Sequence, residues 1–315
     1  MEKNIKNNRV RHYLADTDLE PGEILKVLAL AAKIKKQPQK YRAAFKNKTV
    51  ALLFEKLSLR TKFTLQIGVH EMGGFTVVND GRIPDREPVA DIARNLTRWV
   101  DLVAARVYSH SVLEDLARHS EVPVVNALSD LYHPCQILAD MLTLKEHFGD
   151  LKKIKIAFVG DGNNVANSLI LASGSLGLNM AIATPKGYEP RRQIIARAEI
   201  LNNKSGGKFS ATHNIAEAVK NADVIYTDTW VSMGDEKDAA KRREDFKNFQ
   251  VTTKTFKQAK PNAMFMHCLP KHPNEEVAEE VFESARSLVF EQAENRLHAI
   301  KALLFYLLSS GGKVK

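Results

Sequence analysis

The 315-residue sequence is long enough for two domains of ordinary size, and its 44% hydrophobic and 26% charged residues are typical of a globular protein. No apolar run reaches the length of a membrane-spanning helix, and residues 1–6 lack the apolar segment of a signal peptide. The two cysteines, Cys135 and Cys268, lie far apart and match no metal-binding or redox spacing. We therefore expect a reduced, cytoplasmic protein with no membrane partner.

The formal net charge of +9 raises the question of nucleic-acid binding. Basic residues are spread from Lys3 to Lys315 rather than massed in one arm, and the aromatic residues form no stacking platform. We therefore expect no nucleic-acid partner. An excess of positive charge suits small anionic substrates equally well.

The first half of the chain alternates between strand and helix patterns, which are recognised by apolar runs and by amphipathic periodicity. The expected strands are 49–54, 75–78, 100–106 and 122–125, and the expected helices are 22–35, 61–72, 88–98 and 111–119. Such alternation predicts an α/β fold with a parallel sheet flanked by helices.

A second alternating series follows a helix predicted over 134–148, which Pro134 opens and Gly149 closes. Its expected strands are 154–159, 179–183, 223–227, 263–266 and 287–290, and the last amphipathic helix covers about 292–309. We therefore expect two α/β domains, with the helix near 134–150 as the bridge between them.

Polar clusters follow the predicted strands in both halves. They are residues 58–62, Arg106 and 126–136 in the first half, and 160–164, 228–234 and 267–270 in the second. Open parallel sheets bind ligands at the carboxyl ends of their strands, and two such edges that face each other enclose a cleft. This placement predicts a binding cleft between the domains.

The segment Ser58-Leu59-Arg60-Thr61-Lys62 predicts an anion site at a helix start. Ser58 is a suitable N-cap, so the residues after it present free backbone N–H groups. Arg60 and Lys62 oppose the helix dipole in the first turn, a mismatch that a bound anion resolves. Taken alone, the segment is equally compatible with a capped surface helix that carries stray basic residues.

The loop at 160–164 follows a buried strand, as a dinucleotide-binding loop does. Val165 stands where that fingerprint needs a third glycine, and no acidic residue follows the next strand to hold a ribose. We therefore do not expect a nicotinamide cofactor. Asn164, near the helix start, remains a candidate for binding a polar ligand.

Three further segments carry polar groups suited to binding. His133 and Gln136 lie one turn apart at a helix start and can hydrogen-bond a carbonyl or an amide, although a capping histidine and a surface glutamine fit the pattern too. Asp228 ends a strand and suits a substrate ammonium group. Arg296 can reach inward to an anion or form a surface ion pair.

Cys268 lies in the segment His267-Cys268-Leu269-Pro270, directly after an apolar strand. A thiol nucleophile is not favoured, because neighbouring strand residues point to opposite faces and no third group is fixed to orient His267. Zinc binding by Cys135, Cys268 and histidines stays an alternative that their spacing does not support.

Together these segments resemble the ornithine carbamoyltransferase family, nearly from end to end. Residues 58–62 are similar to its Ser-Thr-Arg-Thr-Arg loop, and residues 133–136 to its His-Pro-x-Gln. Residues 228–234 match its Asp-x-Trp-x-Ser-Met-Gly, residues 267–270 match its His-Cys-Leu-Pro, and residues 294–296 fit its closing segment.

The resemblance implies transfer of the carbamoyl group of carbamoyl phosphate to L-ornithine, giving L-citrulline and phosphate, in arginine metabolism and with no metal or organic cofactor. It implies a cytoplasmic homotrimer or a multiple of trimers. The implied domains are 1–133 for carbamoyl phosphate, completed by helix 292–309, and 150–291 for ornithine, with 134–149 as the interdomain helix.

The resemblance also implies a role for each site residue. Those expected to bind carbamoyl phosphate are Ser58, Leu59, Arg60, Thr61, Arg82, Arg106, His133, Gln136, Cys268, Leu269 and Arg296. Those expected to position ornithine are Asn164, Asp228, Ser232 and Met233. The implied catalytic group is Arg106, His133, Cys268 and Asp228, with Arg106, Thr61 and His133 polarising the carbamoyl oxygen as it becomes an oxyanion.

Four positions depart from the family pattern. Leu59 replaces a threonine that is expected to act through its backbone, and Lys62 replaces an arginine, with loss of bidentate geometry. Arg82 and Pro84 replace the glutamine and glycine of a Gln-x-Gly loop that reaches into the neighbouring subunit's site. Arg82 either binds phosphate more strongly or marks another acceptor, such as putrescine or an acylated ornithine.

A different class of function is also compatible with this fold, because fold alone does not fix function. The alternative is a catalytically idle, basic protein with a regulatory or nucleic-acid-binding role. Nearly every expected site position holds a residue of the chemical type that the implied reaction needs, which favours the enzyme.

Overall fold

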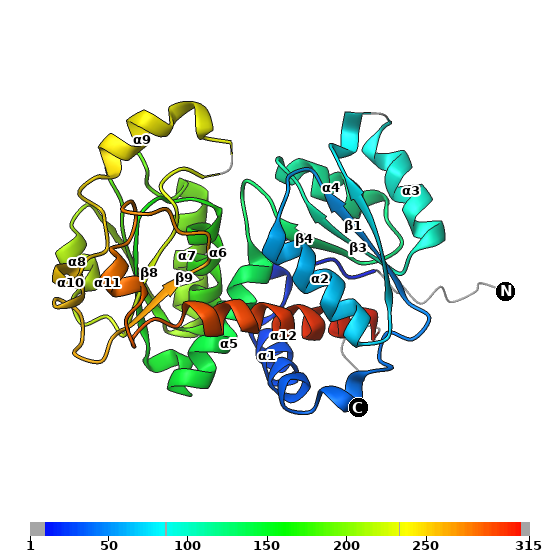
Figure 1. Cartoon of the computed structure of the whole chain (residues 1–315), viewed down its shortest axis with the longest axis horizontal. Coiled ribbons are helices and arrows are strands. Elements are labelled where there is room, and N and C mark those ends of the chain that lie inside the picture. Colours follow the sequence, from blue (N-terminus) through cyan, green and yellow to red (C-terminus); the bar gives the residue numbers. More distant parts are fainter. Residues whose placement is uncertain (1–9, 86, 233, 310–315) are drawn as a thin grey trace.

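The computed structural model describes residues 10–85, 87–232 and 234–309. Two parallel β-sheets, each flanked by helices, lie side by side and form the two halves of the molecule (Figure 1). The α/β fold with two sheets that the sequence predicted is therefore confirmed.

The first sheet has the strand order β2-β1-β3-β4. Its strands are β1 (Thr49–Phe54), β2 (Phe75–Asp80), β3 (Leu102–Arg106) and β4 (Val124–Leu128). The central strand β1 is buried from Val50 to Phe54, because both of its edges pair with other strands and helices cover both faces of the sheet. Its continuous apolar sequence follows from this burial.

The second sheet has the strand order β7-β6-β5-β8-β9, again parallel throughout. Its strands are β5 (Lys155–Val159), β6 (Asn179–Ala183), β7 (Lys208–Thr212), β8 (Val224–Thr227) and β9 (Met264–His267). In both sheets the strands end toward the same side of the molecule, which places the segments after them close together.

The α-helices are α1 (Pro21–Lys36), α2 (Leu59–Glu71), α3 (Val89–Trp99), α4 (His110–His119), α5 (Pro134–Phe148), α6 (Asn164–Leu176), α7 (Arg192–Ser205), α8 (Ile215–Val219), α9 (Ala239–Phe246), α10 (Thr253–Phe256), α11 (Glu279–Phe282) and α12 (Val289–Leu308). Short 3₁₀ turns cover Asp16–Asp18, Pro38–Tyr41, Ile83–Asp85, Leu151–Lys153 and Glu236–Asp238. Within the described ranges, no helix is both long and apolar enough to cross a membrane.

Two predictions about the second half were wrong. The segment 287–290 is not a strand: Ser287 makes a single bridge to Phe265, and the apolar residues after it form the first turn of α12. Strand β7 was missed because it lies at the sheet edge and is largely exposed, so its sequence lacks the apolar run of a buried strand.

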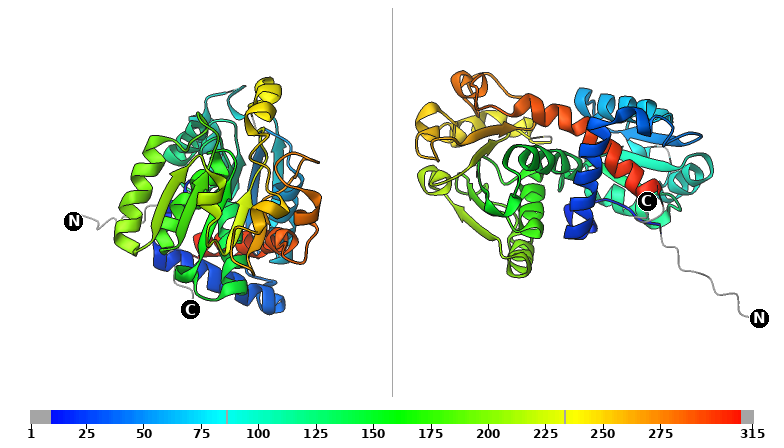
Figure 2. Two further views of the ribbon diagram at one scale, coloured as in Figure 1. Left: turned by 90° about the vertical axis from the view of Figure 1, so that its left-hand side faces the viewer. Right: turned by 90° about the horizontal axis from the view of Figure 1, so that it is seen from below.

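Helices α5 and α12 connect the two halves. Helix α12 packs against α1, α2 and α5 and also contacts β9, so it spans from the second sheet to the helices of the first half (Figure 2, right view, orange to red). This course carries residues near the chain's end into the cleft described below.

Candidate active site

A cleft of about 790 Å³ lies at the carboxyl ends of the strands of both sheets. Its walls come from segments that follow β1, β3, β4, β5, β8 and β9, where the sequence placed the polar clusters. The candidate residues that line it are Ser58, Leu59, Arg60, Thr61, Arg106, His133, Asn164, Asp228, Ser232, Cys268, Leu269 and Arg296. Tertiary folding therefore brings most of the expected site residues to one cavity.

The first turn of α2 forms one wall of the cleft. Ser58 occupies the N-cap position with an extended backbone, but its side chain makes no capping hydrogen bond. Its Oγ instead accepts a hydrogen bond from Arg106 Nη1 at 3.4 Å. The first N–H groups of the helix have no acceptor within the helix, and they favour an anion together with the helix dipole.

Five arginines line the cleft, and three of them, Arg60, Arg106 and Arg296, come from α2, β3 and α12. None of these three forms an ion pair with a carboxylate in the part of the chain that the structure describes. Arg296 is only 3% exposed. Burial, with the charges of Arg296 and Arg60, lowers the pKa of Arg106 to about 10. All three therefore stay cationic at neutral pH. Because burial weakens the screening of their mutual repulsion, a bound anion is favourable between them.

Arg296 joins three helices. Its Nη2 donates to Thr61 Oγ1 on α2 at 2.9 Å, and its Nη1 donates to Gln136 Oε1 on α5 at 2.6 Å. The same Nη1 lies 3.5 Å from Nε2 of His133, whose pKa is well below its ordinary value because of burial and the neighbouring arginines. His133 is therefore a neutral hydrogen-bonding group.

Gln136 is buried behind this wall rather than in the cleft lining. Its Nε2 donates to Asp140 Oδ1 at 2.8 Å, and Asp140 also accepts from Gln292 at 2.7 Å and Tyr226 at 2.9 Å. Burial raises the pKa of Asp140 to about 7. Gln136 thus connects Arg296 to the buried carboxylate of Asp140. The sequence did not reveal this connection.

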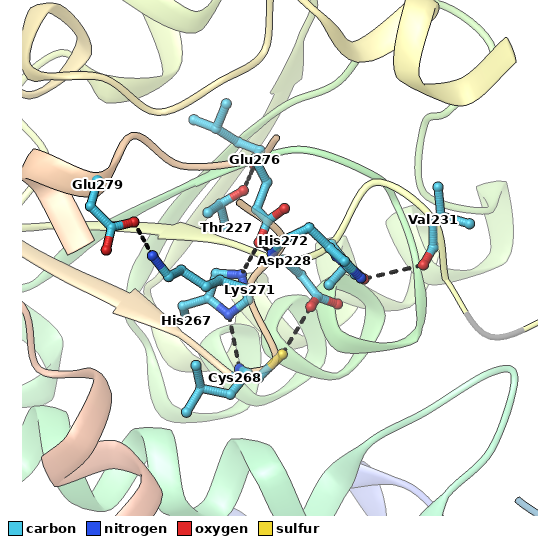
Figure 3. A network of polar contacts seen from close by, with 12 residues as sticks. Thr227, Asp228, Val231, His267, Cys268, Lys271, His272, Glu276 and Glu279 are labelled. Atoms are coloured by element: carbon cyan, nitrogen blue, oxygen red, sulfur yellow. Dashed lines mark hydrogen bonds and ion pairs between the residues drawn. The ribbon is translucent and has the colours of Figure 1, made fainter. Parts of the chain in front are cut away.

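Asp228 lies on the opposite wall, beside other carboxylates that pair with Arg242 or Lys56. Cys268 Sγ donates to its Oδ1 at 3.0 Å (Figure 3). Asn163 Nδ2 donates to its Oδ2 at 2.8 Å and to Ser232 Oγ at 3.1 Å. Burial and the charge of Asp228 raise the pKa of Cys268 well above its ordinary value, so the thiol stays protonated and a thiolate nucleophile is not supported.

Asn163 is a residue that the sequence analysis overlooked in favour of Asn164. Its Oδ1 caps α6 by accepting from Val165 N at 3.0 Å and Ala166 N at 3.1 Å, which aims its amide nitrogen at Asp228. Asn164 lines the cleft and donates to Ser129 O in the first half at 2.6 Å. An asparagine at a helix N-cap was the signal available in the sequence.

Met233, expected to contact ornithine, lies outside the described residues. The loop around it is held by Arg242, whose Nε donates to Trp230 O at 2.6 Å and whose other nitrogens pair with Asp161 and Asp235. Burial nevertheless raises the pKa of Asp161 to about 6. This ion-pair cluster ties the loop after β8 to the loop after β5.

The loop at 160–164 has a packing reason for its glycine. A Cβ on Gly162 would lie 2.4 Å from the backbone nitrogen of Pro190, so only glycine fits this close approach.

Across the mouth of the cleft, Lys56 in the first half pairs with Glu236 in the second at 2.6 Å.

The turn after β9 is organised by a fully buried pair. His267 Nε2 lies 3.0 Å from Glu276 Oε1, and its Nδ1 accepts from Leu269 N at 2.8 Å (Figure 3). His267 is therefore neutral, with its proton on Nε2. The bond to Leu269, whose φ is 62°, fixes the turn that carries Cys268 and Leu269 into the cleft.

Arg82 does not line this cleft. Its side chain is 60% exposed, and its Nε lies 3.8 Å from Asp85. Lys62 also points elsewhere and pairs with Asp80 at 2.7 Å. Cys135 donates to Asn126 O at 3.3 Å and, within the described ranges, joins no cluster of metal-ligating side chains.

Two family models match successive parts of the chain. Residues 11–146 match the family model "Aspartate/ornithine carbamoyltransferase, carbamoyl-P binding domain", and residues 152–307 match "Aspartate/ornithine carbamoyltransferase, Asp/Orn binding domain". The chain belongs to the aspartate/ornithine carbamoyltransferase family.

Individual members of the family align over nearly their whole length. The chain is 44% identical to ornithine carbamoyltransferase of Acidothermus cellulolyticus, over 96% of this chain and 98% of that protein. It is 46% identical to that of Pyrococcus abyssi, over 95% and 96% respectively. The structure of ornithine carbamoyltransferase from Pyrococcus furiosus superposes with a TM-score of 0.92 at 45% identity, covering 96% of this chain and 98% of that one.

Proposed function

We propose that this carbamoyltransferase transfers the carbamoyl group of carbamoyl phosphate to the δ-amine of L-ornithine, giving L-citrulline and phosphate. The observation that carries the proposal is one cleft with two opposed walls. One wall holds three arginines without carboxylate partners in the described chain, and the other holds the Asp228 carboxylate. A dianionic donor and a cationic acceptor suit these walls in that order.

The phosphate binds at the first turn of α2, where free N–H groups, the helix dipole and Arg60 all favour an anion. Arg106 and Arg296 stand beside it to stabilise negative charge on the carbamoyl oxygen as the tetrahedral intermediate forms. Neutral His133 and Thr61 add hydrogen-bonding groups without adding charge. Gln136 keeps Arg296 in place.

Ornithine binds against Asp228, Asn164 and Ser232, and the Cys268–Leu269 turn closes the site between donor and acceptor. Asn163 and Cys268 hold the Asp228 carboxylate from both of its oxygens. Asp228 then orients the amine end of ornithine toward the carbamoyl carbon. Met233, by the family resemblance, belongs to the same contact set.

The reaction needs orientation and electrostatic stabilisation rather than a covalent enzyme intermediate. The δ-ammonium group of ornithine first releases a proton to solvent. The neutral δ-amine nitrogen then attacks the carbamoyl carbon, a C–N bond forms, and the carbonyl oxygen becomes an oxyanion. The C–O bond to phosphate then breaks, and phosphate accepts the proton that the amine loses. Holding both reactants in one cleft removes much of the entropic barrier to this step.

The direct test is citrulline formation from carbamoyl phosphate and L-ornithine, with putrescine, N-acetyl-ornithine and L-aspartate in parallel reactions. We expect the highest kcat/KM with ornithine. Preference for putrescine or N-acetyl-ornithine would keep the chemistry and overturn the assignment of Asp228 and Ser232 to ornithine.

Variants separate the enzyme from an idle binding protein of the same fold. Arg60→Ala should abolish saturable carbamoyl-phosphate binding, whereas Arg94→Ala, which removes an exposed arginine paired with Asp91 on α3, should leave it unchanged. Equal binding by both variants, together with DNA binding that falls steeply with salt, would favour the nucleic-acid alternative.

We further propose that the protein assembles as a homotrimer. An exposed apolar face covers α2 and the edge strand β2, with Leu59, Phe63 and Ile67 one turn apart on the helix and Phe75 and Val77 on the strand. Phe63 is 54% and Phe75 is 65% exposed, which is unusual for such side chains on a monomer surface. Strand β2 leads directly to Arg82, so a neighbour packed on this face receives Arg82 near its own cleft.

Complementation between variants tests the shared site. Arg60→Ala and Arg82→Ala should each be inactive as pure trimers, and trimers reassembled from a mixture should regain activity at sites that combine an intact Arg60 with an intact Arg82 from the neighbour. Mixed trimers without any recovered activity would show that Arg82 serves its own chain or none.

The remaining assignments follow from the same proposal. Residues 1–133 with helix 292–309 form the carbamoyl-phosphate domain, residues 150–291 form the ornithine domain, and 134–149 bridge them. The reaction serves arginine metabolism in the cytoplasm. Fractionation of the native protein with cytoplasmic markers and rescue of an arginine auxotroph test these two points.

A further inference from the structure

Behind the Cys268–Pro270 turn, three side chains converge that the reaction does not use. They are His272, Glu275 and Glu276, and one ligand atom from each lies within 4.8 Å of the others. Each also has a buried atom with no hydrogen-bond partner among the described residues: His272 Nδ1, Glu275 Oε2 and Glu276 Oε2. An imidazole and two carboxylates are side chains that metal ions commonly bind, and each of these three retains an unpartnered buried atom.

Glu276 is the independent indication that something belongs here. Its side chain is completely buried. Its Oε1 is fully used, at 3.0 Å from His267 Nε2 and 2.9 Å from His272 N, while its Oε2 bonds nothing in the described chain (Figure 3). A buried carboxylate oxygen without a partner is unfavourable unless a proton or a cation occupies the space beside it.

The local charge favours a cation. The other oxygen of Glu275 accepts from Arg243 Nε at 2.8 Å, so one of the two carboxylates has a cationic partner. Lys271 points away and pairs with Glu279. His267 is neutral and donates to Glu276. Two carboxylates and one guanidinium leave a net negative charge beside the free imidazole nitrogen.

We propose that His272, Glu275 and Glu276 bind a divalent transition-metal ion of the zinc class. Mixed imidazole and carboxylate ligands suit Zn²⁺ or Co²⁺, whereas Mg²⁺ and Ca²⁺ prefer oxygen ligands throughout. With metal–ligand distances of about 2.1 Å, the ligand atoms of a tetrahedral site lie roughly 3.4 Å apart, so small side-chain movements close this one. His272 also lines the cleft.

A second cluster of potential ligands, Asp228, His267 and Cys268, does not compete for this assignment. Both ring nitrogens of His267 are used, by Glu276 and by Leu269 N. Cys268 Sγ donates to Asp228. That cluster has no unpartnered donor atom of the kind found in the proposed site.

The proposed ion is structural and takes no part in carbamoyl transfer. Its ligand Glu276 holds His267, and His267 holds the backbone of Leu269, so the ion lies two contacts away from the turn that enters the cleft. Binding of the ion should therefore stiffen the turn between β9 and α11. The sequence predicted no metal, and the proposed ion does not depend on which acceptor the enzyme uses.

Cobalt provides a spectroscopic probe. The full chain, treated with a chelator and dialysed, is titrated with Co²⁺ while d–d absorption and calorimetric heat are recorded. We expect one saturable Co²⁺ site per chain, displaced by Zn²⁺, with no sulfur-to-cobalt charge-transfer band in the near ultraviolet. His272→Ala and Glu275→Gln should each weaken binding by at least about tenfold, since the first removes a ligand and the second replaces a charged carboxylate with a neutral amide.

Two matched variants and a folding check complete the design. His213→Ala removes a histidine that pairs with Glu189 elsewhere on the second half, and it should bind Co²⁺ as wild type does. Cys268→Ser should also retain binding. Circular dichroism of the metal-free variants verifies that they are folded.

Three results would each overturn the proposal. One is the absence of Co²⁺ binding by the folded wild type. Another is loss of binding in Cys268→Ser together with a charge-transfer band in the wild type. The third is full affinity in both His272→Ala and Glu275→Gln.

Discussion

Asn163 offers the sharpest test of how the Asp228 carboxylate is positioned, because the two functions of this asparagine can be separated. Its Oδ1 caps α6, and its Nδ2 donates to Asp228 at 2.8 Å and to Ser232 at 3.1 Å. Asn163→Ser keeps a good N-cap and removes the donor. The free energy of unfolding should change by less than about 0.5 kcal/mol, because serine and asparagine cap helices about equally well.

The expected catalytic effect follows from the lost hydrogen bond. A bond to a charged carboxylate contributes about 1.5–3 kcal/mol. If that energy orients Asp228 in the transition state, kcat/KM for ornithine should fall by about 10- to 150-fold. The affinity for carbamoyl phosphate should not change, because the residues proposed to bind the phosphate belong to the opposite wall. Steady-state kinetics at saturating carbamoyl phosphate and calorimetry with carbamoyl phosphate alone measure the two quantities.

Asn163→Asp strengthens the test by replacing the donor with a second carboxylate. At 2.8 Å and an effective dielectric constant of about 20, two such charges repel by roughly 6 kcal/mol. One of the pair must then bind a proton, and ornithine turnover should fall further than in Asn163→Ser. The reasoning is refuted if Asn163→Ser stays within about threefold of wild type in kcat/KM for ornithine, or if it loses carbamoyl-phosphate binding to the same extent as ornithine turnover.

Three further predictions concern the cationic wall, the buried carboxylate behind it and the apolar face. Arg296→Met should lower kcat by roughly 10²- to 10³-fold, as expected for removal of an oxyanion-stabilising group, and a loss below about tenfold in the citrulline assay would remove Arg296 from that role. Burial raises the pKa of Asp140 from 3.8 to about 7, so the native state keeps a proton that the unfolded state releases between these values, and wild-type stability falls as pH rises through that window. Asp140→Asn has no such proton to release. Its free energy of unfolding relative to wild type, measured with denaturant, should therefore rise by up to about 4 kcal/mol from pH 4 to pH 8. A difference independent of pH would contradict this. Phe63→Glu should convert the trimer to monomers in sedimentation velocity and abolish turnover, whereas an active trimer would place the interface elsewhere.

Patterns local in sequence were enough to predict much of the fold. The continuous apolar run of β1 marked a strand buried on both faces, and Pro134 and Gly149 marked the two ends of α5. Strand β7 was not predicted, because its exposure at the sheet edge removes the apolar run on which strand prediction depends. The apolar residues around Val289 were wrongly predicted as a strand, since a short apolar run fits the first turn of a buried helix as well as a strand.

The sequence by itself determined that polar segments follow the strands, and parallel topology then forces those segments to one edge of each sheet. Only the tertiary structure decided which polar atoms meet. Arg296 donates to Thr61 across 235 positions of sequence, and Asn163 reaches Asp228 only because β5 and β8 are neighbours. The proton of His267 lies on Nε2, toward Glu276, because Leu269 N donates to its Nδ1. Hydrogen bonding and loss of water depend on distances between segments far apart in the chain, and local periodicity carries no information about those distances.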